Sequence, residues 1–275
     1  MNYRRRSNPK TRTRRCSMRA GRGGFTLAEV LVASGITVMI AGAMAVMATG
    51  VEQTARYTFA LEEAHQHGRV ALERIQSAVQ GAASSSTNPP AAVLADVSGA
   101  YTFPETLVAW KTDNGDDVPQ ASELVVFCAN PSNPTELWEL TNPGDTQTVS
   151  MIDTTALAAL VSAMKSSGAT RKTVLTTLLR SCTSHDLGPP KPAVRFTLTM
   201  RPSATEWSQY QASTLAWSDL SWAQGIYGTK RGLRQVRVTC ELQIIPDDDD
   251  DGVASPETSA VPFLGSAAMY YELPQ

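Results

Sequence analysis

The chain has 275 residues with 24 Lys and Arg against 26 Asp and Glu, which gives a net charge of −2 at pH 7. Nine of the basic residues lie within the first 24 positions, so the remaining 251 residues carry 15 basic and 26 acidic side chains, a net charge of −11. This acidic balance argues against a nucleic-acid-binding surface, because affinity for phosphates depends largely on Lys and Arg.

The first 51 residues predict a membrane segment that follows a basic terminus. Positions 1–24 hold no acidic residue, and from Phe25 to Val51 there is no proline and the only charged residue is Glu29. A helix over residues 25–51 is roughly 40 Å long, which is enough to cross a hydrocarbon core of about 30 Å. The positive-inside rule then predicts a single membrane pass, with the N-terminus cytoplasmic and the rest of the chain exported.

Two ordinary explanations of this segment leave features unexplained. A secretory signal has an apolar core of about 7 to 15 residues and a small-x-small cleavage site. Such triplets begin at Ala41 and Ala43, but the apolar run is longer and continues past them. A plain membrane anchor fits the length but gives no reason for Glu29, since a charge in hydrocarbon is costly and usually has a partner.

The stretch GGFTLAEVLVA, residues 23–33, resembles the type IV prepilin signal. The resemblance implies that residues 1–24 are a cytoplasmic leader, that a prepilin peptidase cuts between Gly24 and Phe25, and that Phe25 becomes an N-methylated terminus. It also implies that Glu29 meets the N-terminal amine of a neighbouring subunit inside a filament. Such a carboxylate is favoured by the helix dipole and by a charge-assisted hydrogen bond.

Residues 52–83 predict an amphipathic helix that continues the membrane segment. Small and apolar residues recur at three- and four-residue steps, and most charged residues fall between them. This stripe consists of Leu61, Ala64, Gly68, Ala71, Ile75, Ala78 or Val79, and Ala82. The serine cluster and the two prolines of residues 84–90 are expected to end the helix.

Residues 91–275 predict one globular, β-rich domain. The whole chain is therefore expected to have an α+β fold in which a long N-terminal helix packs on an antiparallel sheet. Strands are expected at residues 106–112, 123–129, 135–141, 193–200, 236–245 and 268–273. A helical insertion is expected in two parts, at residues 154–168 and 170–182.

Three cysteines follow the leader, so at most one intramolecular disulfide can form. Cys128 and Cys240 are each in phase with the apolar residues of a predicted strand, which points both thiols inward. They can form a disulfide, which an exported compartment permits, or they can act as two small buried hydrophobes.

The run DDDDDG, residues 247–252, matches part of a calcium-binding loop. Asp247, Asp249, Asp251 and Gly252 fit the start of an EF-hand loop, but its twelfth position holds Thr258 where Ca²⁺ requires a bidentate Glu. A solvated acidic loop is the alternative to a Ca²⁺ site, and no other cofactor is expected.

No motif in the sequence predicts an enzyme. His65 and His67 are two residues apart on a predicted helix, so their side chains face different directions and do not suit a shared metal. The G-x-S-x-G, H-E-x-x-H, P-loop and C-x-x-C motifs are absent from the sequence. The five tryptophans are expected to be core or interface anchors.

These features predict a structural minor subunit, a pseudopilin or pilin, of a type II secretion-like or type IV pilus filament. Its expected partners are other pilin-like subunits, the prepilin peptidase and the inner membrane. The mature length and the stretch RVALERIQSAVQGA, residues 69–82, resemble J-type pseudopilins and W-type minor pilins. The alternative is a minor pilin that serves as a binding module for DNA or a surface ligand, and the charge of −11 weighs against DNA.

Overall fold

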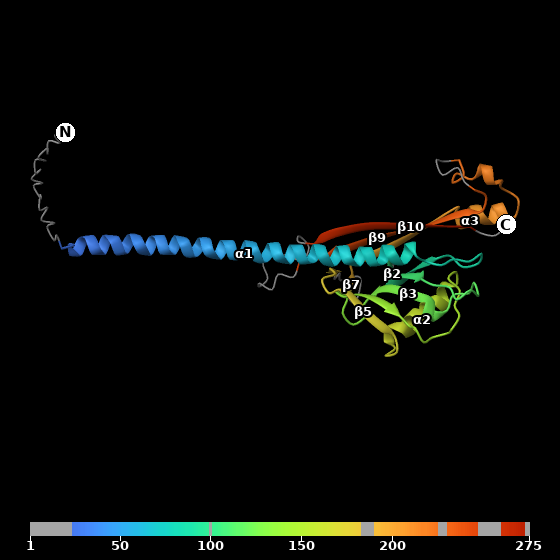
Figure 1. Cartoon of the computed structure of the whole chain (residues 1–275), viewed down its shortest axis with the longest axis horizontal. Helices are drawn as coiled ribbons and strands as arrows, with labels where there is room; N and C mark the ends of the chain where they lie inside the picture. The colour runs from blue at the N-terminus through green and yellow to red at the C-terminus, as the bar shows by residue number, and fades with distance from the viewer. Residues whose placement is uncertain (1–23, 99–100, 183–189, 225–229, 247–259, 273–275) are drawn as a thin grey trace, which may run out of the picture. The chain divides into compact units, whose positions relative to one another are not determined.

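The computed structural model describes residues 24–98, 101–182, 190–224, 230–246 and 260–272. Internal contacts divide the chain into two units, Met1–Gln53 and Thr54–Gln275. One long helix, α1 (Leu27–Gln80), is combined with antiparallel sheets and a few short helices (Figure 1). The predicted α+β class is therefore confirmed.

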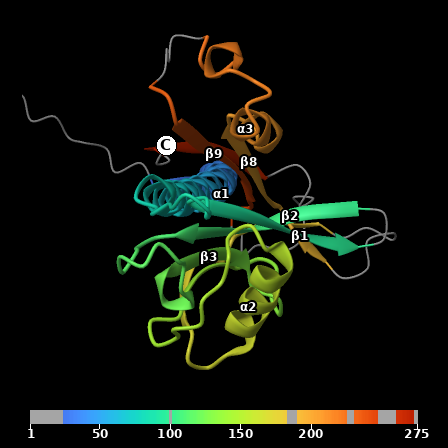
Figure 2. The same cartoon turned by 90° about the vertical axis from the view of Figure 1, so that its right-hand side faces the viewer.

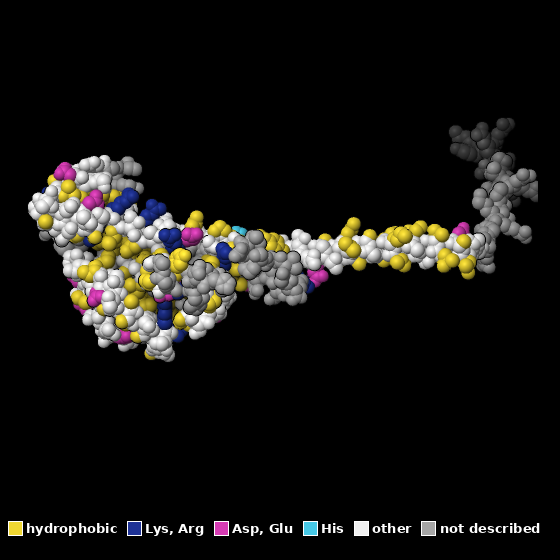
Figure 3. All heavy atoms as spheres, turned by 180° about the vertical axis from the view of Figure 1, so that it is seen from behind, with side chains coloured by type: hydrophobic (Ala, Val, Ile, Leu, Met, Phe, Trp, Pro, Cys, Tyr) yellow, Lys and Arg dark blue, Asp and Glu magenta, His cyan; other side chains and the backbone are white. Residues whose placement is uncertain are grey.

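The first unit contains the apolar part of α1. This helix is long and apolar enough to cross a membrane, and no proline interrupts it between residues 27 and 80. Its large apolar side chains are exposed, as for Leu31, Met39 and Val46, and Figure 3 shows apolar side chains all along this part of the helix. Such a surface is suited to lipid or to the apolar faces of other helices.

In the second unit, the last part of α1 is amphipathic, as its sequence period predicts. Its buried side lies at steps of three and four residues and consists of Ala60, Ala64, Gly68, Ala71, Ile75 and Val79. Burying Ile75 or Val79 contributes roughly 1.5–3 kcal/mol each. The helix ends before Gly81, and the amide N–H of Ala83 then donates to the carbonyl of Trp110 at 2.6 Å.

Two antiparallel sheets form most of the second unit. The first has five strands in the order β1 (Ala91–Ser98), β2 (Tyr101–Trp110), β3 (Leu124–Ala129), β4 (Leu137–Thr141) and β5 (Arg171–Thr176). The second has three strands in the order β10 (Val261–Glu272), β9 (Leu233–Ile244) and β8 (Val194–Arg201). The two-residue strands β6 (Ser181–Cys182) and β7 (Lys191–Pro192) pair with each other.

The second half of α1 lies between the two sheets (Figures 1 and 2). One apolar cluster joins Ile75 and Val79 of the helix to Phe127 of β3 and Val238 of β9. The opposite face of the first sheet is covered by α2 (Thr154–Ser166), whose Leu157 and its neighbours pack against that face in a second cluster. The layers therefore follow the order second sheet, α1, first sheet, α2.

The start of α2 is fixed by a side-chain cap. The carboxylate of Asp153 accepts hydrogen bonds from the amide groups of Thr155 at 3.1 Å and Ala156 at 3.0 Å. An aspartate at this position satisfies amide groups that have no partner within the helix. The helix then runs through Lys165 in its last turn, which places that side chain next to the edge of the first sheet.

Most of the tryptophans are buried in the packed interior. The sequence predicts that they are core or interface anchors, and these are core anchors. Trp110 is fully buried. Trp217 and Trp222 form a separate apolar cluster with Leu220, beside the short helices α3 (Ala204–Gln211) and η2 (Trp217–Asp219). Trp207 packs at the edge of this cluster, and the guanidinium of Arg234 lies 5.0 Å from the centre of its ring.

The second part of the predicted helical insertion is wrong. Residues 171–176 form the edge strand β5, and Ser181 and Cys182 form β6. The β-branched Thr173 and Val174 pair with Glu139 and Trp138 of β4, and such cross-strand pairs favour a strand over a helix. The sequence analysis also did not predict the strands β1 and β7, the helix α3 or the short 3-10 helices η1 (Ala121–Glu123) and η2.

Candidate processing and assembly site

Gly24 and Phe25 lie just before the first turn of α1, which begins at Leu27. Phe25 is 85% exposed. A Cβ atom added at Gly24 would meet no other atom within 4 Å. The fold therefore does not itself require glycine at position 24, and the peptide bond between Gly24 and Phe25 is accessible in the described part of the chain.

Thr26 and Glu29 cap the helix reciprocally. The amide N–H of Thr26 donates to Oε2 of Glu29 at 2.8 Å, and the Thr26 hydroxyl donates to the same oxygen at 3.0 Å. In return, the amide N–H of Glu29 donates to the Thr26 hydroxyl oxygen at 3.3 Å. The carbonyl of Thr26 accepts the first helical hydrogen bond from Val30 at 3.2 Å. This arrangement is a capping box, in which Thr26 is the N-cap residue.

The capping box gives Glu29 a partner that the sequence analysis overlooked. The signal was present as a Thr followed three residues later by Glu, directly before an apolar run. The negative charge is also favourably placed at the positive end of the helix dipole. Glu29 thus has a role within its own chain, in addition to any contact with a neighbour.

One carboxylate oxygen of Glu29 remains available. Both hydrogen bonds from Thr26 go to Oε2. No described residue donates a hydrogen bond to Oε1 of Glu29. Because a carboxylate has about four lone-pair sites, it can keep the cap and still accept from a cationic donor.

The two buried cysteines, Cys128 and Cys240, are not joined. Cys128 lies in the cluster beneath α2, whereas Cys240 lies in the cluster that contains α1, and both are free thiols. Burial raises the pKa of the Cys128 thiol to about 11 and that of Cys240 to about 12. Both side chains are therefore protonated at neutral pH and pack as small apolar groups.

The remaining polar residues that the sequence analysis considered are the two histidines of α1 and the aspartate run. The histidines contact other residues of the fold, and the aspartates are not among the residues that the structure describes. Asp247, Asp249 and Asp251 lie outside the described residues. Nδ1 of His67 is 3.2 Å from the hydroxyl of Thr176. The ring of His65 packs edge-on against the ring of Phe263, and the two ring centres are 5.6 Å apart. Within the described ranges, no group of three or more His, Cys, Asp or Glu side chains is placed to hold a metal ion.

No protein-family model matches the chain, and neither a curated protein nor a solved structure is significantly similar to it.

Proposed function

We propose that the chain is a minor pilin-like subunit of a filament that is assembled from the inner membrane. The observation that carries the proposal is a capped apolar helix that begins directly after an accessible Gly24 and Phe25 and whose only charge up to Val51 is Glu29. Neither a cleaved signal nor a simple anchor needs this combination.

The two parts of α1 support different roles in such a subunit. In the second unit, one side of the helix is buried against the two sheets, and the helix acts as the spine of the domain. In the first unit, it presents an uncovered apolar surface. Lipid can cover this surface before assembly, and the corresponding helices of neighbouring subunits can cover it afterwards.

Processing and pairing follow from the residues at the helix start. A prepilin peptidase cuts between Gly24 and Phe25 and methylates the new terminus. The free Oε1 of Glu29 then accepts the Phe25 amine of a neighbour while Oε2 keeps the cap. The basic residues before position 24 hold the leader in the cytoplasm, and the domain after residue 53 is exported.

Within this class, the chain suits a larger minor subunit of the J-type or W-type rather than a major pilin. The support is the length after processing and the stretch of residues 69–82 that ends the spine. The role of the subunit is to join a secretion or pilus filament. Capture of DNA is the weaker alternative, because the processed chain has a net charge of −11.

The N-terminal sequence of the full chain purified from membranes tests this function. We expect a terminus at Phe25 that carries an N-methyl group. The matched variant Gly24→Val should keep its leader, and its melting temperature should equal that of the wild-type precursor because position 24 has open space. A wild-type terminus after Ala43 or Ala45, or an uncut chain, would contradict the proposal.

A further inference from the structure

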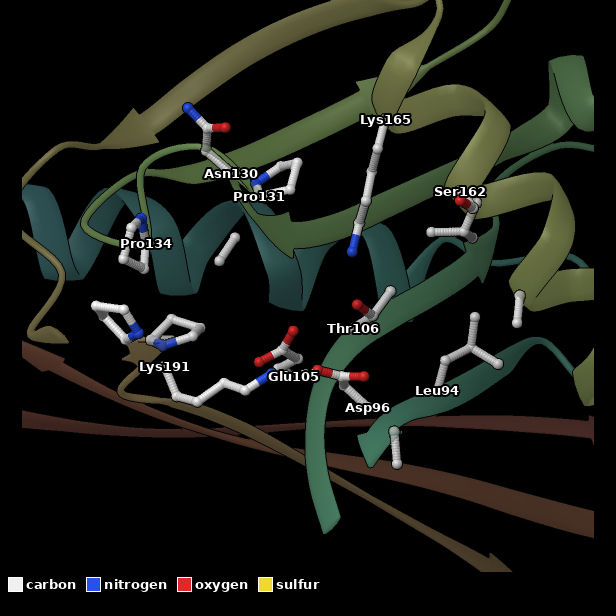
Figure 4. Close-up of a pocket in the computed structure, with 16 residues that line it drawn as sticks. Leu94, Asp96, Glu105, Thr106, Asn130, Pro131, Pro134, Ser162, Lys165 and Lys191 are labelled. Carbon is white, nitrogen blue, oxygen red and sulfur yellow. Dashed lines mark hydrogen bonds and ion pairs between the residues drawn. The ribbon is translucent and has the colours of Figure 1, made fainter. Parts of the chain in front are cut away.

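A pocket of about 400 Å³ lies in the second unit, between α2 and the edge of the first sheet (Figure 4). Its walls come from five places in the sequence: the end of β1, β2, the turn between β3 and β4, α2, and β7. Four prolines give it rigid apolar surface, namely Pro131, Pro134, Pro190 and Pro192. Its volume is at the lower end of the range of small-molecule sites, about 300–1,000 Å³.

One of the two lysines in the pocket is already neutralised. Lys191 forms an ion pair with Asp96, and its side chain is only 13% exposed. Its ammonium also lies 5.3 Å from the centre of the Phe103 ring. Lys191 is thus held by partners of the fold, and its charge is balanced by Asp96.

The second lysine, Lys165, has no ion pair with any residue in the described part of the chain. Lys165 extends from the last turn of α2 across the pocket toward Thr106 and Glu105 (Figure 4). Among the described residues, none accepts a hydrogen bond from its ammonium or pairs with it. The nearby Lys172 differs, because its ammonium donates a hydrogen bond to the backbone carbonyl of Lys165 at 2.8 Å. The ammonium of Lys165 therefore faces the pocket with no ion-pair partner among the residues that the structure describes, and Glu105 is the acidic group whose pKa it influences.

Glu105 forms the floor between the two lysines. Its Oε2 is buried and has no hydrogen-bond partner within the described ranges. Burial raises the pKa of this carboxyl, Lys191 and Lys165 oppose the rise, and Asp96 adds to it. In its protonated form Glu105 is a hydrogen-bond donor, and the pocket then has one uncompensated positive charge.

We propose that this pocket binds the carboxylate of a small, mainly apolar acid. The ligand carboxylate pairs with the ammonium of Lys165 and accepts a hydrogen bond from Glu105, while its carbon chain lies against the prolines. A cation is disfavoured because, with Glu105 protonated and Lys191 paired with Asp96, the lining keeps the positive charge of Lys165. A single uncompensated charge also suits a monoanion better than a phosphate.

The carboxylate can come from a free organic acid or from the C-terminus of a peptide, since both present the same group. This binding activity goes beyond a role as a filament subunit. It does not depend on leader cleavage or assembly, so the two proposals can fail separately.

Titration of the full chain in detergent micelles with butyrate and with butyramide tests the proposal, with binding followed by calorimetry. Butyrate should bind saturably, and butyramide, which has the same size but no charge, should bind at least tenfold more weakly. Lys165→Met should weaken butyrate binding at least tenfold, whereas Lys165→Arg should retain it within a few-fold. Lys230→Met, at a lysine that does not line the pocket, should have no effect, and melting curves should establish that each variant is folded.

The pH dependence provides a second test. The titratable groups that face Glu105 are Lys165 on α2, Lys191 on β7, Asp96 on β1 and the Cys128 thiol on β3. Butyrate affinity should fall as the pH rises through the raised pKa of Glu105, because this carboxyl must be protonated to donate. Glu105→Gln donates at every pH and should therefore abolish this fall.

A peptide pair identifies the source of the carboxylate. N-acetyl-Ala-Ala with a free C-terminus is compared with the same peptide as its amide. If the peptide acid binds at least tenfold more tightly than butyrate, the ligand is a peptide C-terminus. If it does not, the ligand is a free acid. The proposal is overturned if neither acid binds, if butyramide equals butyrate, or if Lys165→Met binds butyrate as the wild type does.

Discussion

Gly68 of α1 lies directly against the ring of Phe263 in β10. A Cβ atom at position 68 would be 2.5 Å from Cζ of that ring and 2.6 Å from both Cε atoms. The small residue thus lets the helix approach the edge strand of the second sheet. Gly265 of β10 makes a similar close contact with α1, since a Cβ atom at this position would be 2.9 Å from a methyl group of Leu72.

Gly68→Ala is expected to destabilise the domain although alanine is the better helix former. Helix propensity would favour alanine by about 1 kcal/mol, but the overpacking costs about 1–3 kcal/mol. We expect a net loss in the free energy of unfolding, measured by denaturant melts of the full chain in detergent. Gly168→Ala, which has open space, is the control. In a Phe263→Leu background, Gly68→Ala should become neutral or stabilising; the same loss in both backgrounds would exclude the ring as its cause.

A buried carboxylate on β4 holds α1 to the first sheet. Arg74 donates to Glu139 through Nε at 3.0 Å and through a terminal nitrogen at 2.9 Å. The Glu139 side chain is 10% exposed and that of Arg74 is 56% exposed. Arg74→Met should lower the free energy of unfolding by about 1–3 kcal/mol, because the buried acid loses its charged partner.

The double variant with Glu139→Met separates the pair from the individual residues. It should recover part of the loss, because it removes the unpaired buried charge. Arg69→Met, on an exposed position of the same helix, should change stability by no more than about 0.5 kcal/mol. A double variant as unstable as the sum of both single variants would mean that the two side chains are not coupled.

Two substitutions at Glu29 separate capping from charge pairing. Glu29→Gln keeps an oxygen that accepts from Thr26 but removes the charge, whereas Glu29→Val removes both. If the neighbour's amine needs the carboxylate, both variants should be cleaved normally and neither should form cross-linked subunits in membranes. Assembly of the Gln variant at the wild-type level, with failure of the Val variant, would show that the cap alone is required. Thr26→Ser, which preserves the cap, is the matched control.

Glu105 should make the domain less stable as the pH rises. Its pKa is raised in the folded state, mainly by burial, so the folded protein binds the proton more tightly than the unfolded chain. The cost is absent below the unfolded pKa and grows until the pH passes the raised folded pKa. Glu105→Gln should therefore melt at a higher temperature than the wild type at pH 7 and at the same temperature near pH 4. An equal difference at both pH values would show that ionisation is not its cause.

The sequence predicted features that depend on local period and composition. The buried stripe of α1 and the strands around Phe127 and Val238 are examples, because a period of 3.6 or 2 is visible in the residues themselves. Residues 171–176 were misassigned since the pairing of Val174 with Trp138 depends on a distant strand. The contact of Gly68 with Phe263 could not be predicted either, because the two residues are far apart in the sequence.

The two candidate sites, the start of α1 and the pocket beside α2, also differ in how far the sequence could predict them. Gly24, Phe25 and Glu29 lie within six positions of one another, so the sequence alone can suggest a site there, and their roles in processing and assembly stay predictions. The cap from Thr26 was not expected. The pocket could not be predicted, because Glu105, Lys165 and Lys191 come from three separate elements. Neither lysine has a distinctive sequence context, and only the fold brings them to one carboxyl group.

The insertion of α1 between the sheets sets an order for the maturation of the chain. Ile75 and Val79, which are made early, share one core with Ala267 and Tyr271 of β10, the last strand. The ribosome must therefore synthesise the chain as far as β10 before this core can close. Until then the apolar stripe of α1 is not permanently buried. A chain that stops before residue 261 therefore exposes this stripe, which makes it prone to aggregation or proteolysis. Completion of β10 is thus a built-in check that only chains that contain this strand form a stable domain.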